Sequence, residues 1–447
     1  MSAVKLGYDQ QSQYYAEHLG ELNKTNEVVS TEDIVSSRGI LIARSGARID
    51  IEVSRKLLRH KLAKPLYSQV SIKDRINSGN LKEEYQRLYA RMPDLVMISD
   101  ASGLREEFDD MVLGYRLPRL LAQNLTVLRE RKRQVFDQAL FTALLSVLIA
   151  RKLELTPTEV RAAYIAGLVH DMGLLHIAPR IVDKKEDLTA DEWRAIQSHV
   201  VIGQMLVQQV ADEVPPVASV AVLEHHERCD CSGYPTGASG RDLHVLGQII
   251  AITDSLEAVR VNQFQRWNLN LASAGPFLQM NCTTHFFDVY EALHNLIKRS
   301  GLKPVTFNPY ETLELFAHEL LQRTRVLERA LPALEAVNKV VDDIKLPYKY
   351  RSLRRIPSRV IHMIHASGLL RGELCEWLAG DAIGSGDDVL HELNDIELLQ
   401  NELRWQLANL QRVLNEYLVK NKDGHSAHPI LQKALTELRD CLGKLRN

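Results

Sequence analysis

Apolar residues recur at helical spacing over most of the chain and alternate with polar residues only near its start. The stretch from Arg38 to Val53, RGILIARSGARIDIEV, alternates around Ser45-Gly46 and predicts a β-hairpin. From about residue 120 onward, apolar residues three and four positions apart predict helices. The expected fold is therefore mainly α, with a small α+β N-terminal domain (1–118), a helical domain (119–301) and a helical C-terminal extension (302–447).

The central domain contains the most apolar of the expected helices. Residues 135–153, VFDQALFTALLSVLIARKL, carry apolar side chains on nearly every face, which predicts a buried central helix. Its apolar core, Ala139 to Ala150, is too short to span a bilayer. Two capping boxes, Thr156 with Glu159 and Thr189 with Glu192, predict helix starts. The second box is expected to open one helix that carries His199 in its middle.

The last third is also expected to be helical. Residues 309–344 predict one or two long helices, with Pro332 as the point of a break. A later seam of apolar residues repeats at three and four positions, which is typical of a packed or coiled-coil helix. It could serve an intramolecular bundle or a homodimer through the C-terminal helices. The seam comprises Ile396, Leu399, Leu403, Leu407, Leu410, Leu414 and Tyr417.

Composition narrows the class of protein. The chain has 55 Lys and Arg and 57 Asp and Glu residues, so no global field favours a nucleic-acid polymer or an anionic membrane as partner. The N-terminal residues lack the apolar run of a signal peptide. Five cysteines form no disulfide framework. We expect a reduced, cytoplasmic protein without a membrane span.

Six side chains capable of metal binding lie inside or at the ends of apolar segments. Burying imidazole or carboxylate without a partner is costly, because each group would lose its hydration. A single such histidine is most often structural, but the whole set predicts a metal centre, and phosphoester hydrolysis is the chemistry it favours. The set comprises His170 and Asp171 in GLVHDMGLL, His199 in IQSHVVIG, His225 and His226 in LEHHERCDCSGYP, and Asp254 in IIAITDSLEAV.

The mixture of donors indicates how metals would be shared. A carboxylate can bridge two ions, so Asp171 is expected at the centre. His199 and His225 would then serve one ion, and His170 with Asp254 the other. Imidazole and carboxylate together suit Fe, Mn, Zn or Co better than Mg or Ca. Two such ions can activate water and hold phosphoryl oxygens during in-line attack.

These motifs resemble the HD-GYP subgroup of the HD phosphohydrolase superfamily over residues 120–300. The matching elements are HDMG, a later histidine, HHERCDCSGYP and the TDSLEAV segment. The resemblance implies an all-helical, metal-dependent phosphodiesterase domain of bacterial signalling. Its substrate would be cyclic di-GMP, opened to the linear dinucleotide or to GMP.

The resemblance also implies roles for individual residues. The metal ligands would be His170, Asp171, His199, His225, His226 and Asp254, with Asp171 as the catalytic bridging residue. They would hold two or three divalent transition-metal ions, with Fe or Mn favoured and Zn, Co or Ni as alternatives. Glu227, Asp230, Gly233, Tyr234 and Pro235 would form a loop that contacts substrate or other signalling proteins.

Two departures from the family pattern affect charge. The lysine that follows HD-x-G in the family, where it helps to hold substrate phosphate, is Leu174 here. His176 or Arg180 could replace its charge. Where the family places a histidine or glutamate on the preceding helix, this chain has Asp137 or Gln138 as the candidate extra ligand.

Other departures affect the loop and the segment after Asp254. The family's glycine after the motif aspartate is Cys231, which would restrict the loop. The segment that follows Asp254 is replaced by RVNQFQRWNLNLASAG. The favoured function is hydrolysis of cyclic di-GMP. The alternatives are a degenerate domain that acts as a nucleotide receptor or protein-interaction module, and a phosphohydrolase for another nucleotide.

Overall fold

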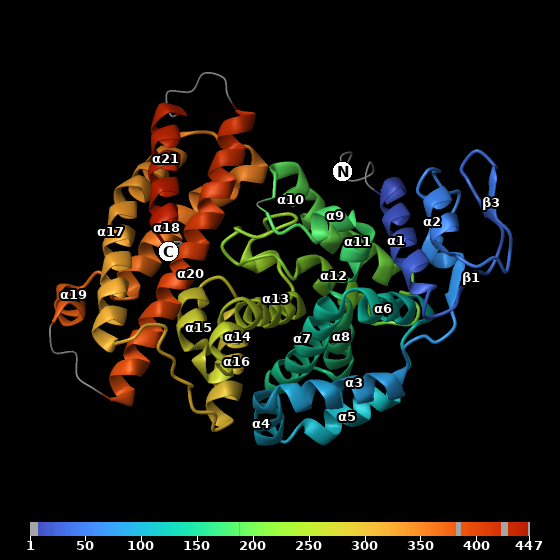
Figure 1. Ribbon diagram of the computed structural model, residues 1–447, viewed down its shortest axis with the longest axis horizontal. Coiled ribbons are helices and arrows are strands. Elements are labelled where there is room, and N and C mark those ends of the chain that lie inside the picture. Colours follow the sequence, from blue (N-terminus) through green and yellow to red (C-terminus); the bar gives the residue numbers. More distant parts are fainter. Residues whose placement is uncertain (1–7, 187, 381–385, 422–427, 446–447) are drawn as a thin grey trace. The chain divides into compact units, whose positions relative to one another are not determined.

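The computed structural model describes residues 8–186, 188–380, 386–421 and 428–445, without the side chains of 8–13, 348 and 349. The first seven residues of the expected N-terminal domain lie outside these ranges. The chain forms two compact units. The first comprises Met1–His226 and His244–Glu257, and the second Glu227–Leu243 and Ala258–Asn447. The described elements are mostly helices (Figure 1), as the sequence predicted.

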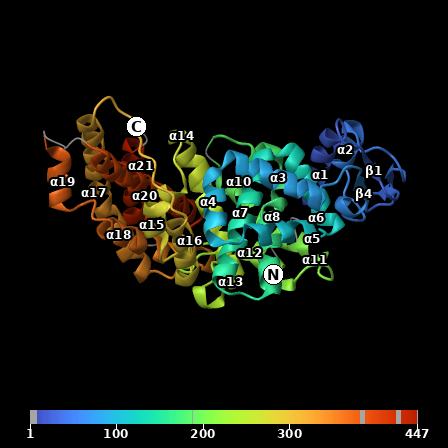
Figure 2. The ribbon, with the colours of Figure 1, turned by 90° about the horizontal axis from the view of Figure 1, so that it is seen from below.

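The first unit begins with a small α+β segment (Figures 1 and 2). Its strands form two antiparallel pairs, β1 with β4 and β2 with β3. Val28 lies opposite Ile72 in one pair, and Ile34 opposite Ala43 in the other. The elements are α1 Tyr8–Leu22, β1 Val28–Ser30, β2 Ile34–Val35, β3 Leu41–Ala43, α2 Ile51–Leu57, η2 Leu66–Ser68 and β4 Val70–Ile72.

The hairpin expected around Ser45-Gly46 is wrong in its pairing. The chain does turn there, with Gly46 at φ +79°, but β3 pairs with the preceding strand, β2. Of the residues expected as the second strand, Arg48 bridges Val29 of β1. The last three, from Ile51 on, enter α2, because Asp50 caps that helix by accepting a hydrogen bond from the Val53 backbone at 2.9 Å. A local N-cap therefore prevails over the alternating pattern.

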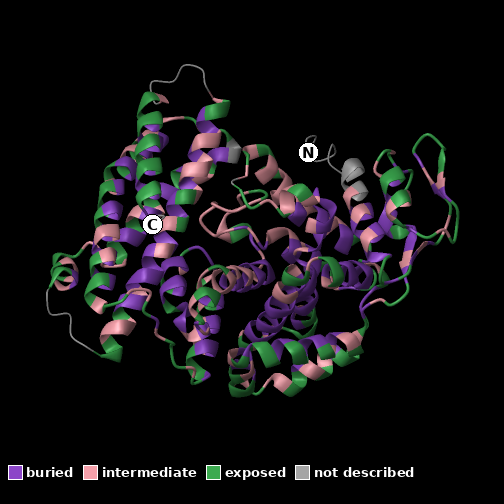
Figure 3. Cartoon of the chain, in the orientation of Figure 1, coloured by how far each residue is buried: buried purple, intermediate pink, exposed green. Residues whose placement is uncertain are grey.

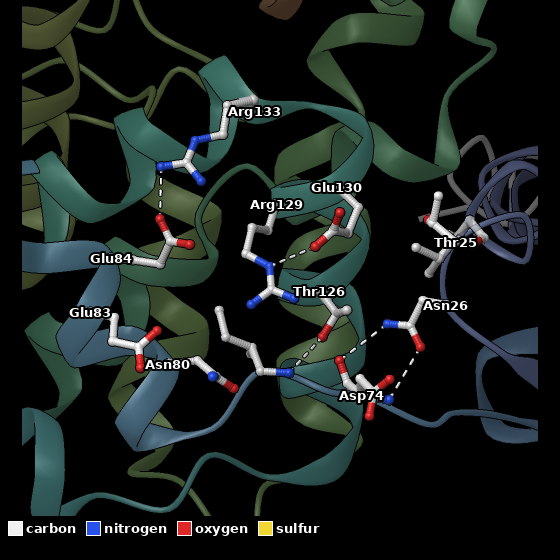
Figure 4. Close-up of polar contacts among 12 residues, drawn as sticks. Thr25, Asn26, Asp74, Asn80, Glu83, Glu84, Thr126, Arg129, Glu130 and Arg133 are labelled. Atoms are coloured by element: carbon white, nitrogen blue, oxygen red, sulfur yellow. Dashed lines mark hydrogen bonds and ion pairs between the residues drawn. The ribbon is translucent and has the colours of Figure 1, made fainter. Parts of the chain in front are cut away.

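Polar contacts join this segment to the helices that follow (Figure 4). The Thr126 hydroxyl accepts a hydrogen bond from the Ile76 backbone at 2.9 Å. Asn26 exchanges two hydrogen bonds with the Asp74 backbone, at 3.1 and 3.2 Å. These bonds satisfy backbone groups at the entry to α3 and fix it against α6. The helices here are α3 Ser78–Arg91, α4 Pro93–Ser102, α5 Arg105–Gly114 and α6 Arg119–Arg131.

The core of the first unit is the helix pair α7 Arg133–Lys152 and α8 Pro157–Val169. Both are largely buried (Figure 3). By length and composition α7 passes as a candidate membrane span, but 72% of its apolar window is buried inside the protein. The expectation of a buried central helix is confirmed. The capping box of Thr156 and Glu159 opens α8 as predicted.

The helix expected to run through His199 is divided. Thr189 and Glu192 do form a capping box, but α10 ends at Gln197 and α11 starts at His199. At the junction, Ser198 Oγ donates to the Ala195 carbonyl and His199 Nδ1 bonds the Ile196 carbonyl. Side chains therefore take acceptors that helix N–H groups would otherwise use. The elements are η3 Met172–His176, α9 Pro179–Val182, α10 Ala190–Gln197, α11 His199–Gln208, α12 Pro216–Glu224 and α13 Val245–Val259.

The second unit is a helical bundle. Helix α17 is one helix of 31 residues with Pro332 inside it. The described elements are η4 Gly240–Asp242, η5 Arg260–Phe264, α14 Gln265–Trp267, η6 Leu271–Ala274, α15 Gly275–Asn281, α16 Phe287–Arg299, α17 Leu313–Asp343, η7 Tyr348–Arg354, α18 Ile356–Ala366, α19 Gly372–Ala379, α20 Asp387–Lys420 and α21 His428–Lys444.

The apolar seam of α20 packs inside this bundle. All of its residues from Ile396 to Tyr417 belong to a core cluster shared with α17, α18 and α21. Helices α17, α20 and α21 run side by side (Figure 1). Of the two roles left open by the sequence, the intramolecular one is observed, so this face is used within the chain.

Candidate metal centre and the loop that follows it

The first unit brings all six predicted ligands together, five of them at helix ends. His170 is the C-cap of α8 and Asp171 follows it, while His225 is the C-cap of α12. The other members are His199 at the start of α11, His226 after α12, and Asp254 within α13. Two groups have donor atoms within 4.8 Å of one another: Asp171 with His199, His225 and His226, and Asp171 with His170 and Asp254.

Asp171 is common to both groups. Its Oδ1 lies 3.1 Å from His199 Nε2 and 3.8 Å from His225 Nε2. Its Oδ2 lies 3.6 Å from His170 Nε2. The two carboxylate oxygens therefore face different histidines, which is the arrangement expected of a bridging ligand.

Asp254 completes the second group. Its Oδ1 lies 3.6 Å from His170 Nε2, and its Oδ2 lies 3.9 Å from His226 Nδ1. On the helix that carries it, the neighbouring apolar residues Ala251, Ile252 and Leu256 are buried. A carboxylate in such surroundings requires positive charge nearby.

Backbone carbonyls orient three of the histidines. Nδ1 of His170, His199 and His225 each bonds a carbonyl three residues earlier, at 2.8, 2.7 and 2.7 Å. A carbonyl only accepts, so each Nδ1 carries the proton in the neutral ring, and each Nε2 presents its lone pair. This second bond is typical of metal-binding histidines.

One donor atom of the cluster, His170 Nε2, is not satisfied by the described residues. This atom is buried and has no hydrogen-bond partner among them. His199 Nε2 and His225 Nε2 lie 3.2 Å apart. In neutral rings with Nδ1 protonated, two lone pairs would face each other, and a proton held with Asp171 or a metal ion would relieve that repulsion. The donor set therefore fits divalent metal.

The electrostatics of the apo cluster follow from its carboxylates. Burial lowers the pKa of His170, but Asp171 and Asp254 outweigh burial and raise that pKa to about 9. Burial, with His170 and His199 nearby, holds the pKa of His225 well below its usual value. Burial raises the pKa of Asp171, and the histidines reverse this and lower it well below its usual value. Asp171 is thus a carboxylate at neutral pH.

Gly173 allows the backbone around the cluster to close. A Cβ at this position would lie 2.1 Å from the His199 carbonyl oxygen and 2.8 Å from its carbon. No side chain fits there without moving the start of α11. The glycine of the HDMG motif is therefore explained by the close approach of the chain segments that carry Asp171 and His199.

The loop after His226 belongs to the second unit and is organised by Glu227. Its Oε1 accepts hydrogen bonds from Thr236 N at 2.6 Å, Thr236 Oγ1 at 2.7 Å and Gly237 N at 3.1 Å. Its Oε2 accepts one from Ala238 N at 3.1 Å. Glu227 therefore closes the loop on itself, a role that the motif alone does not reveal.

Asp230 links the loop to the C-terminal bundle. It accepts a hydrogen bond from Ser232 N at 3.0 Å and forms an ion pair with Arg359 of α18. Between Asp230 and Ser232, Cys231 adopts φ +65°, a conformation that favours glycine. The restriction of the loop that was expected at Cys231 is therefore this positive φ angle, which a residue with a Cβ rarely adopts. Gly233 and the Tyr234-Pro235 pair follow, the latter with a cis peptide bond.

The candidate replacements for missing family residues behave differently. Asp137 is paired with Arg91 at 2.7 Å and Arg133 at 2.8 Å, and it is in neither metal-capable group. Gln138, half-buried beside it, stays the candidate for an extra ligand. The π-helical residues Arg260–Phe264 occupy the start of the segment that departs from the family after Asp254.

His176 cannot supply the charge missing at Leu174. It is buried and stacks on Tyr15, with ring centroids 4.9 Å apart. Burial lowers its pKa to about 3, so the ring is neutral at physiological pH. That alternative is wrong, while Arg180 is exposed.

Sequence reasoning missed the basic residues that contact the loop. Arg359 pairs with Asp230, and Arg351 donates to the Gly237 carbonyl at 3.3 Å. Both lie more than 100 positions from their partners. The available signal was compositional, because residues 344–372 contain seven Lys and Arg residues and no Asp or Glu.

Residues 115–288 match the protein-family model described as HD domain. The chain is 30% identical over 216 residues to cyclic di-GMP phosphodiesterase PA4108 of Pseudomonas aeruginosa, covering 48% of this chain and 50% of that protein. It is 35% identical over 134 residues to the cyclic di-GMP phosphodiesterase response regulator RpfG of Xanthomonas campestris pv. campestris, covering 30% of this chain and 35% of that protein. It is 30% identical over 139 residues to 3'3'-cGAMP-specific phosphodiesterase 3 of Vibrio cholerae, covering 31% of this chain and 29% of that protein. The chain thus spans half or less of the length of these relatives.

Proposed function

We propose that this protein, whose residues 115–288 match the HD domain family model, is a metal-dependent phosphodiesterase that hydrolyses cyclic di-GMP. The observation that carries the proposal is the convergence of three imidazole Nε2 atoms on the Asp171 carboxylate. An HD domain match without those donors would support only a fold. The donors without the match would support only a metal site.

We further propose two metal positions, with Asp171 shared between them. His199, His225 and His226 would hold one ion, and His170 with Asp254 the other. The mixed donors favour Fe or Mn, with Zn, Co or Ni as alternatives. When bound, such ions would activate water and stabilise charge on the phosphoryl oxygens.

The protein's own residues would set the geometry of this centre. The carbonyls of Gly167, Ile196 and Val222 hold three rings in the tautomer that leaves Nε2 available. Asp171 stays ionised at working pH because the neighbouring imidazoles favour its carboxylate form. Gly173 permits the close approach that brings His199 to Asp171. None of these roles requires a protein nucleophile.

The relatives' names support a cyclic dinucleotide as the substrate class. Two of those reported are named for cyclic di-GMP and one for 3'3'-cGAMP. Both compounds contain phosphodiester bonds in a macrocycle of two nucleotides. We place cyclic di-GMP first because the relative with the longest matched stretch is named for it.

A second candidate is a nucleotide receptor with little turnover. The observation that favours it is Leu174, a half-buried apolar residue where the family carries a lysine. The buried, neutral His176 does not compensate for that loss. The receptor would bind the same ligand, so binding alone does not separate the two functions.

Product analysis tests the proposal. The full chain, reconstituted with Fe or Mn under anaerobic conditions, is incubated with cyclic di-GMP or 3'3'-cGAMP, and the products are separated by chromatography. The proposal predicts linear dinucleotide or GMP from cyclic di-GMP, and none from the Asp171→Asn protein. Tight binding without product in the metal-loaded protein would favour the receptor. Faster turnover of 3'3'-cGAMP would change the substrate but keep the reaction.

A further inference from the structure

The second unit contains a strongly basic segment outside the HD domain match. Residues 344–372 carry seven Lys and Arg residues and no Asp or Glu, in a chain of net charge −2. The acidic residues that flank the segment are Asp343 and Glu373. Such local charge in a nearly neutral protein indicates a surface for an anion.

Part of this segment lines a pocket of about 370 Å³. That volume falls in the range of small-molecule sites, roughly 300–1,000 Å³. Four of the lining residues are cationic and one comes from the loop. The lining residues are Cys231, Lys345, Leu346, Arg351, Arg354 and Arg355.

Three of the cationic lining residues, Lys345, Arg354 and Arg355, form no ion pair with a described carboxylate. Arg354 is anchored by neutral acceptors, donating to the Val341 carbonyl at 3.2 Å and the Ile344 carbonyl at 2.7 Å. Those bonds satisfy the end of α17 and fix the guanidinium without cancelling its charge. Within the described ranges, neither Lys345 nor Arg355 forms an ion pair, and both are exposed. Arg355 is also the N-cap of α18, whose N-terminus adds partial positive charge.

Two arginines hold the loop against the same segment. Arg351 donates to the Gly237 carbonyl at 3.3 Å, and Arg359 pairs with Asp230. Arg359 also donates to Ser232 Oγ at 3.0 Å and to Gln406 Oε1 at 2.7 Å. These bonds explain why Cys231 forms a wall of the pocket. A ligand seated there would touch both the loop and the C-terminal segment.

We propose that this pocket binds a phosphoryl group of a nucleotide. Guanidinium groups match the geometry of phosphate oxygens and bind them through two parallel hydrogen bonds. The concave shape favours a small ligand over a polymer. The choice of a nucleotide rests on the proposed function. The phosphoryl group has two sources, the cyclic dinucleotide substrate itself or a second nucleotide that regulates the protein.

The test removes charge where no structural contact is lost. The double variant Lys345→Gln/Arg355→Gln changes two lining residues that make no ion pair with a described residue. The matched control, Lys298→Gln/Arg299→Gln, removes two exposed cations of the same unit that lie outside the basic segment and do not line the pocket. Affinities of the full-length proteins for cyclic di-GMP, GMP and inorganic phosphate are measured by calorimetry, with and without chelator. Steady-state turnover is measured in parallel.

The pocket variant should bind at least one of these phosphate compounds about 10- to 100-fold more weakly than the control, as expected when a charge-assisted hydrogen bond is lost. If the substrate is the source, KM for cyclic di-GMP rises by that factor. If a second nucleotide is the source, KM is unchanged and binding of GMP in chelator weakens. Equal affinities for all three compounds in both proteins would overturn the proposal. Weakened binding in a protein without turnover would uphold the pocket and reject the proposed function.

Discussion

His199 and His225 present Nε2 atoms 3.2 Å apart, and each ring donates its Nδ1 proton to a backbone carbonyl. If both rings were neutral, two lone pairs at this distance would repel, and either a proton held with Asp171 or a metal ion relieves that repulsion. The two rings come from different helices, α11 and α12, whose packing therefore creates the binding geometry. This pair separates a metal centre from an ordinary cluster of buried histidines.

Substitution of His225 should remove metal without removing the fold. His225→Asn deletes one donor of the group that includes Asp171 and His199. Even residues that only orient ligands change metal affinity by about 10- to 100-fold, so loss of a ligand should cost more than about 100-fold. Metal affinity is measured by competition with a chelating dye, and helicity by circular dichroism. His362→Asn, at an exposed position, is the control. Unchanged affinity would remove His225 from the centre.

Gly173→Ala should damage the site through sterics alone. The added Cβ would meet the His199 carbonyl oxygen at 2.1 Å, so α11 must shift. We expect a loss of roughly 1–3 kcal/mol in the free energy of unfolding, with weaker metal binding. The control is Gly114→Ala at the end of α5, where an added Cβ meets nothing within 4 Å. Denaturant titration measures the free energy of unfolding of both variants. Equal stability of the two variants would show that the backbone there has room to adjust.

Much of the site was predictable because its signals are local. Capping boxes at Thr156 and Thr189 and the polar residues at the ends of apolar runs are visible in short windows of sequence. The break before His199 was not, because it depends on side chains competing for carbonyls within one turn.

Long-range partners escaped prediction for a different reason. Asp230 and Arg359 lie 129 residues apart, and no periodicity connects them. The expected hairpin failed because β3 found its partner in β2 and not in the residues after the turn. After the turn, Arg48 bridges Val29 of β1, and the cap at Asp50 starts α2 at Ile51.

Leu174→Lys should raise catalytic efficiency if a missing cation limits the enzyme. A lysine can form a charged hydrogen bond to phosphate, worth about 1.5–3 kcal/mol, which corresponds to roughly a 10- to 100-fold change. Leu174→Met, which conserves volume without adding charge, is the control. Steady-state kinetics with cyclic di-GMP provide the measurement. If the lysine and methionine variants have the same kcat/KM, a missing cation at position 174 does not limit the enzyme.

Acid should destabilise the protein through two buried histidines. Burial lowers the pKa of His176 to about 3, and burial with Lys132 and Arg131 outweighs Asp183 and lowers that of His18 to about 4. The unfolded chain, with pKa values near 6.5, binds more protons in this range. Stability is therefore complete above about pH 6.5 and declines as the pH falls toward 4, by up to roughly 1.4 kcal/mol per pH unit and histidine.

His176→Phe should lessen this acid sensitivity. Phenylalanine can keep the stacking on Tyr15 but does not titrate. The free energy of unfolding, measured from pH 7.5 to 4.5, should fall less steeply than in the unmodified protein. The difference in slope should correspond to about one proton fewer taken up on unfolding. His362→Phe, at an exposed position, should retain the original slope. A His176→Phe protein with the original slope would assign the acid sensitivity to other groups.

The central claim is that the cluster around Asp171 binds metal and thereby hydrolyses a cyclic dinucleotide. The most direct measurement titrates Mn or Fe into chelator-treated full-length protein and records bound metal and cyclic di-GMP turnover on the same samples. The account predicts no turnover without metal and a rate that rises with occupancy to a plateau at about two equivalents, as a shared carboxylate between two ions requires. Turnover that persists in metal-free protein, or full occupancy without turnover, would contradict it.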